Sequence, residues 1–131
     1  MVSLCAQKQQ QLAMHIETHH IGTKKVAEVS AKAILIGNVE NALQLMADLY
    51  YQEFDAIIID EQNIIPDFFD LKTGIAGEIL QKFSNYRMQL FIIGDFDKYP
   101  GKSIRDFIYE SNKGKIVNFL ASAELAKQRL G

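Results

Sequence analysis

The sequence predicts an α/β fold built on a mixed sheet of about five strands, and three observations support this prediction. Two strand-like runs, His15–Ile21 and Lys25–Ser30, flank the pair Gly22-Thr23, which is typical of a hairpin turn. Short, continuously apolar runs follow, as expected for parallel strands covered on both faces: Ala56–Ile59, Leu90–Ile93 and Ile116–Leu120. Segments with helical periodicity separate these runs, so the predicted order is a hairpin, a helix and then strand and helix units.

The first predicted helix begins after Asn38, a good N-cap residue, and ends near Tyr51. Its apolar residues recur every three or four positions and define one face: Val39, Ala42, Leu43, Met46, Leu49 and Tyr50. Further helices are predicted over Thr73–Asn85, Ile104–Asn112 and Ser122–Leu130. In the third helix, Ser103 is the expected N-cap with Asp106 at the capping-box position, and Ile104, Phe107 and Ile108 are expected to face the core.

Length and composition favour one folded domain over residues 14–131, preceded by a disordered extension over residues 1–13. Hydrophobic residues make up 48% of the chain and charged residues 23%, which is globular composition. Regular patterning starts directly after Met14, so Met14 is an alternative natural start to Met1.

The net charge of −2 gives the chain no overall positive field, so we expect neither nucleic acid nor an anionic membrane surface as a partner. The longest apolar runs are strand-sized and too short for a membrane span. Cys5 is the only cysteine, which excludes an intrachain disulfide and favours the cytoplasm. The Gln-rich run Gln7–Gln11 stands where a signal peptide needs an apolar region.

The segment Gln62–Lys72 is long for a connection between a strand and a helix, which usually takes about two to six residues. Thr73 and Gly74 then stand at the expected helix start, where a hydroxyl, free N–H groups and the helix dipole suit an anion or a phosphoryl group. Asp70, Lys72 and Gly77 complete this candidate binding or phosphorylation corner. Two structural alternatives remain: Thr73 is an ordinary N-cap, or Asp67 starts the helix one turn earlier and places both glycines inside it.

Acidic residues follow two predicted strands, at the edge where open parallel sheets usually bind ligands. Asp60, Glu61 and Asp95 are therefore candidate ligands for Mg²⁺, with Asp97 close by in the sequence. Solvated loop acids and turn caps are the simpler interpretation, because such loops are generally polar.

Two further patterns are weaker. Gly101-Lys102-Ser103 resembles a phosphate-binding loop, but Phe96 occupies the position that the motif reserves for its first glycine. His15 and His19 share one face of a predicted strand while His20 lies on the other, and the sequence offers this histidine pair no evident third metal ligand.

Two stretches closely resemble the bacterial domain-of-unknown-function family 4180, over Met14 to about Leu130. They are Pro66-Asp67-Phe68-Phe69-Asp70-Leu71-Lys72-Thr73-Gly74-Ile75-Ala76-Gly77-Glu78-Ile79-Leu80, and Gly94-Asp95-Phe96 with Lys98-Tyr99 and Lys102-Ser103-Ile104-Arg105-Asp106-Phe107-Ile108-Tyr109-Glu110-Ser111-Asn112. The resemblance implies no particular chemistry.

The element order is more distantly similar to the STAS domain of sulfate transporters and anti-sigma-factor antagonists. In regulatory STAS members, a Ser before Gly at the second helix is phosphorylated, which implies Thr73 as the equivalent acceptor. Those members place an Asp two residues before the acceptor, whereas Asp70 is three before Thr73.

These patterns favour a noncatalytic regulatory or protein-interaction module without a cofactor, which presents Gln62–Gly77 to a protein partner. The alternative is a metal-assisted phosphoryl-transfer or hydrolytic enzyme that uses Asp60, Glu61 and Asp95. No Ser, His and Asp set has the spacing expected for nucleophilic catalysis, so the enzyme is the second choice.

Overall fold

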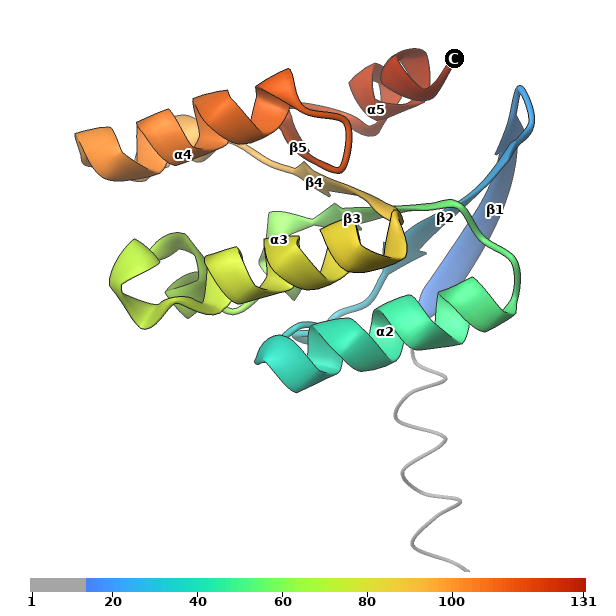
Figure 1. The fold of residues 1–131 in the computed structure, drawn as a ribbon, viewed down its shortest axis with the longest axis horizontal. Coiled ribbons are helices and arrows are strands. Elements are labelled where there is room, and N and C mark those ends of the chain that lie inside the picture. Colours follow the sequence, from blue (N-terminus) through green and yellow to red (C-terminus); the bar gives the residue numbers. More distant parts are fainter. Residues whose placement is uncertain (1–13) are drawn as a thin grey trace, which may run out of the picture.

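The computed structural model describes residues 14–131 (Figure 1). Residues 1–13, which include Cys5 and were predicted to be an extension, lie outside the described residues. The choice between Met1 and Met14 as the natural start depends on the same segment and is not tested. The strands are β1 (His15–Ile21), β2 (Lys24–Ser30), β3 (Ala56–Asp60), β4 (Gln89–Ile93) and β5 (Val117–Leu120). The helices are α2 (Val39–Tyr51), α3 (Ile75–Tyr86), α4 (Lys102–Lys113) and α5 (Ala123–Leu130).

The five strands form one sheet in the order β1-β2-β3-β4-β5. The β1–β2 pair is antiparallel, and every later neighbour pair is parallel. The predicted α/β fold, with a five-stranded mixed sheet that begins with a hairpin, is therefore confirmed. Within residues 14–131, no helix is long and apolar enough to cross a membrane.

Helices α2, α3 and α4 lie side by side over one face of the sheet (Figure 1). Each connects one parallel strand to the next in the same direction, and right-handed crossovers then put all three on the same side. Their buried residues pack on alternate residues of the strands, such as Ile57 and Ile59 of β3 and Leu90 and Ile92 of β4. This layer holds the larger core cluster, in which Phe83 of α3 is fully buried.

The helix α5 covers the opposite face of the sheet. Its Ala126 and Leu130 pack with a second cluster from the strands, which includes Val26, Ile58 and Phe91. The chain therefore turns to one face after β4 and to the other face after β5.

The face of α2 differs in part from the prediction. Ala42, Met46 and Leu49 are buried as expected, but Tyr50 is 55% exposed and Leu45 is buried instead. Tyr50 contacts Tyr86 of α3 edge-on, with 6.0 Å between ring centroids. The apolar periodicity thus located the helix correctly, but it placed Tyr50 on the buried face and left Leu45 out of it.

Two predicted helix starts are wrong. α3 begins at Ile75 with Gly74 as its N-cap, because the Thr73 hydroxyl is turned back onto the preceding chain. α4 begins at Lys102 with Gly101 as its N-cap and no side-chain cap, so Ser103 and Asp106 form no capping box. Asp106 instead accepts from the ammonium of Lys102 at 2.7 Å, an ion pair one turn apart on the helix.

The long connection between β3 and α3 is packed rather than loose. It forms three successive 3₁₀ turns, Glu61–Asn63, Pro66–Phe69 and Leu71–Thr73. Ile64, Phe68 and Phe69 are buried in the larger core cluster. The amide of Asn63 donates to the carbonyl oxygens of Ala31 and Ala33, at 2.8 and 2.9 Å, which fastens the segment to the chain after β2. Burial of these side chains explains the unusual length.

Candidate functional site

The predicted corner at the start of α3 consists of Asp70, Lys72, Thr73, Gly74 and Gly77, and all five residues are exposed. The Thr73 hydroxyl lies 2.9 Å from the carbonyl oxygens of both Asp67 and Asp70, to which it donates. The same oxygen accepts from the N–H of Ile75 at 3.3 Å. Thr73 therefore closes the turn before the helix, although it is one residue outside the N-cap position.

The remaining polar groups of the corner also hold the turn. The Asp70 carboxylate accepts from the backbone N–H of Lys72 at 3.2 Å. Gly74 has φ = +76°, in the left-handed region that L side chains rarely adopt, so the turn requires a glycine there.

Gly77 has no comparable structural requirement. It lies in the first turn of α3, and a Cβ placed on it would meet nothing within 4 Å. A glycine within a helix costs up to about 1 kcal/mol relative to alanine, and here no neighbouring group offsets that cost. Gly77 is exposed, so its backbone is uncovered by a side chain in the turn that follows Thr73 and Gly74.

The candidate acids at the strand ends each have a partner of their own. The Asp60 carboxylate accepts from the backbone N–H of Gln62 at 2.9 Å, and that of Asp95 accepts from the N–H of Asp97 at 3.1 Å. Glu61 is buried and forms an ion pair with Lys98, at 2.8 Å. Asp60 and Asp95 thus cap 3₁₀ turns, whereas Glu61 is directed at the loop after β4.

Glu61 fastens that loop to the end of β3. Its carboxylate also accepts a hydrogen bond from the Tyr99 hydroxyl at 2.7 Å, while Phe69 stacks on the Tyr99 ring with 4.4 Å between centroids. Burial, reinforced by the hydrogen bond to Glu61 and by its negative charge, raises the pKa of Tyr99 above its usual range. This contact joins residues 38 positions apart, and nothing local in the sequence signals it.

Gly94 makes room for this carboxylate. A Cβ on Gly94 would lie 2.6 Å from three atoms of the Glu61 side chain, closer than real contacts allow. The glycine at the end of β4 is thus explained by close approach of a side chain, and not by a bound phosphate. The ammonium of Lys102, the other residue of the apparent phosphate loop, is paired with Asp106.

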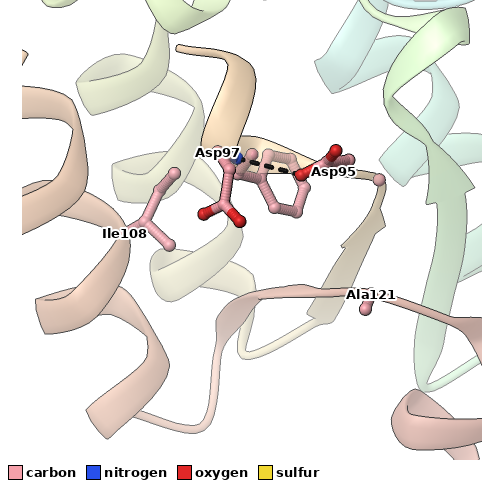
Figure 2. A pocket seen from close by; sticks show the side chains of 6 residues that line it. Asp95, Asp97, Ile108 and Ala121 are labelled. Atoms are coloured by element: carbon pink, nitrogen blue, oxygen red, sulfur yellow. Dashed lines mark hydrogen bonds between the residues drawn. The ribbon is translucent and has the colours of Figure 1, made fainter. Parts of the chain in front are cut away.

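An open depression with a volume of about 390 Å³ lies where the chain after β4 and the chain after β5 turn to opposite faces. This is the crevice that a change of face creates at the carboxyl edge of a parallel sheet. Its lining residues are Gly94, Asp95, Phe96, Asp97, Ile108 and Ala121. Figure 2 shows Asp97 between Asp95 and Ile108. Asp95 borders this depression, while the buried carboxylate of Glu61 is paired with Lys98 and Tyr99.

A different group of metal-ligating side chains comes together on the hairpin. Among residues 14–131, Glu17, His19 and Glu28 offer ligand atoms that all lie within 4.8 Å of one another. The sequence pattern indicated His19 as a candidate ligand but neither of the two glutamates. The signal was present in the hairpin, because a two-residue turn at Gly22-Thr23 sets Glu17 directly opposite Glu28.

Comparison with known proteins identifies a family. No curated protein matches the chain. A family model described as a domain of unknown function, DUF4180, matches residues 21–130, which include β2 to β5, helices α2 to α5, the start of α3 and the Glu61 contact. The chain therefore belongs to the DUF4180 family.

Proposed function

We propose that this chain is a noncatalytic, cytoplasmic regulatory module of STAS-like fold that binds a protein partner through the start of α3. The binding surface, here called the α3 corner, consists of Asp70, Lys72, Thr73, Gly74 and Gly77. The observation that carries the proposal is Gly77, an exposed helical glycine that no internal contact requires. Bare helix backbone lets the backbone of a partner approach closely, which compensates for the lower helix propensity.

The rest of the corner supports the same function. Asp70 and Thr73 bond within the turn, so the partner would meet a preformed surface and lose little conformational entropy there. Lys72 adds an exposed positive charge beside that surface. A rigid, exposed loop and helix start is a common location for binding residues.

The order of a strand pair followed by helix and strand units supports the STAS-like assignment, and with it a regulatory role for Thr73. A phosphoryl group on Thr73 would remove the hydroxyl proton that is donated to Asp67 and Asp70, and would place negative charge beside their carbonyl oxygens. We therefore expect phosphorylation to open the turn and to change partner binding.

The enzyme alternative would require Asp60, Glu61 and Asp95 to bind a metal ion together. Saturable Mg²⁺ binding, with chemical-shift changes confined to these residues, would favour that alternative. Their existing bonds to Gln62, Lys98, Tyr99 and Asp97 favour the interaction module, because a metal would have to displace Lys98 from Glu61.

The test is affinity capture from the native cell with matched variants of α3. Gly77→Leu adds a large side chain to the α3 corner, and we expect it to abolish partner capture while the protein remains folded. Ser84→Leu is the control, because Ser84 is an exposed residue of the same helix seven positions further on. Thr73→Glu, which mimics phosphorylation, is expected to change capture as well. Equal capture by wild type, Gly77→Leu and Thr73→Glu would refute the proposal.

A further inference from the structure

Three side chains with metal-ligating atoms meet on the face of the hairpin that α5 covers. Glu17 and His19 come from β1, and Glu28 comes from β2. Their ligand atoms, one imidazole nitrogen and two carboxylate oxygens, all lie within 4.8 Å of one another. This group is remote from the α3 corner, which lies at the other face of the sheet.

The hairpin register explains why these side chains share one place. Glu17 pairs directly with Glu28, and His19 pairs with Val26, so all three project to the face that carries Val26 and the second core cluster. Two carboxylates directly opposite each other on a sheet repel, which destabilises the strand pair unless a positive charge lies between or beside them. The hairpin therefore places a pair of anions where a cation stabilises it.

The histidine and the second glutamate are already aligned. The Nε2 atom of His19 lies 2.8 Å from Oε1 of Glu28. Without a metal, the tautomer with a proton on Nε2 donates to this carboxylate, and metal binding through Nε2 requires that proton to leave, with the other ring nitrogen carrying the remaining one. The side chains of His19 and Glu28 are 20% and 31% exposed, so both are partly withdrawn from water. Partial burial strengthens their attraction for a cation relative to fully solvated side chains.

Lys127 of α5 places a positive charge beside Glu28. Its ammonium lies 3.7 Å from Oε1 of Glu28 and 3.8 Å from Oε1 of Glu124, one turn away on the same helix. With two carboxylates at nearly the same distance, Lys127 can keep Glu124 as its partner when another cation occupies the position beside Glu28.

We propose that Glu17, His19 and Glu28 bind a divalent transition-metal ion of the Zn²⁺ class. One imidazole with two carboxylates is a ligand set that suits zinc, and the imidazole disfavours Mg²⁺ and Ca²⁺, which prefer oxygen ligands alone. Ligand atoms of a tetrahedral zinc ion lie about 3.4 Å apart, given bonds of about 2.0 to 2.1 Å. Glu17 is exposed, so rotation of its side chain can bring its carboxylate oxygen from within 4.8 Å of the other two ligand atoms to the spacing that zinc needs. Water would complete the coordination.

Metal binding here would join β1 to β2. β1 is an edge strand, paired on one side only, by β2. Ligands on both strands turn the repulsion between Glu17 and Glu28 into attraction through the ion. Because the ion binds the folded hairpin and not the unfolded chain, it should raise the melting temperature of the protein, and the stabilisation should grow with the logarithm of its concentration once that exceeds the dissociation constant.

The experiment is a ZnCl₂ titration of the full chain without an affinity tag, followed by calorimetry and by thermal melting. It is carried out in a Cys5→Ser background, because Cys5 is itself a potential zinc ligand. We expect one saturable site and a melting temperature that rises with Zn²⁺. His19→Ala and Glu28→Gln should each weaken binding by at least about tenfold, and Lys127→Met should tighten it by removing a competing cation.

The matched control is His20→Ala, which removes a histidine from the same strand on its opposite face. It should bind Zn²⁺ as the background protein does. Failure of the background protein to bind saturably would overturn the proposal. Equal loss of binding in His19→Ala and His20→Ala would overturn it as well, because the metal would then not depend on the face that carries Glu28.

Discussion

The two faces of the sheet are covered in different ways. Helices α2, α3 and α4 enclose one face with a continuous apolar layer. The eight-residue helix α5 covers the other face with Ala126 and Leu130, and at its charged margin Lys127 lies beside Glu28 of β2. The difference teaches that the groups that build the core and the proposed binding groups lie in different parts of this chain. The three-helix face supplies most of the buried core, and the candidate binding groups lie at helix starts, strand ends and the margin of α5.

The largest expected effect compares the two faces by truncation. Phe83→Ala removes a fully buried ring from the three-helix face and should lower the free energy of unfolding by about 3 to 5 kcal/mol. Leu130→Ala, at 8% exposure on the α5 face, should cost about 2 kcal/mol. Urea denaturation of both variants measures this, and a greater loss for Leu130→Ala would contradict the comparison.

The next effect concerns the contact that fastens the β4–α4 loop to β3. Gly94→Ala should destabilise the protein by about 1 to 3 kcal/mol, because the new methyl group displaces the paired carboxylate of Glu61. Glu61→Ala removes the obstructing atoms, so the double variant should lose less stability than the sum of the two single variants. Strict additivity in this cycle would show that the close approach of Gly94 and Glu61 has no energetic consequence.

A smaller effect concerns alkaline pH. The raised pKa of Tyr99 means that, above the usual tyrosine pKa of about 10, the unfolded chain loses this proton while the folded chain retains it. The stabilisation is therefore complete below that pH and declines as the pH rises further. The free energy of unfolding of the wild type should fall more steeply between about pH 9 and 11 than that of Tyr99→Phe, and equal slopes in the two proteins would contradict the assignment.

Features that depend on neighbouring residues could be predicted from the sequence. The hairpin at Gly22-Thr23 and the apolar runs of β3, β4 and β5 are local patterns, and each lies within about one residue of its predicted place. Local hydrogen bonds shifted the helix starts. Thr73 has the chemistry of an N-cap, yet its hydroxyl bonds backward to Asp67 and Asp70, so Gly74 becomes the cap.

The features that were missed depend on residues far apart in the chain. Glu61 has an acidic side chain after a strand, like Asp60, but it is buried because Lys98 and Tyr99 come back to it from the next loop. The contact between His19 and Glu28 depends on the register of the hairpin, which the strand prediction did not use. A local pattern identifies an acidic or basic residue, and only the topology supplies its partner.

The most direct test of the α3 corner is Gly77→Ala, with stability and partner capture measured on the same preparation. Because a Cβ at this position meets nothing within 4 Å, we expect the free energy of unfolding to rise by up to about 1 kcal/mol. Partner capture should fall at the same time, and fall further in Gly77→Leu. A loss of stability in Gly77→Ala would show that the glycine serves the fold, and capture at the wild-type level by both variants would contradict the proposed binding surface.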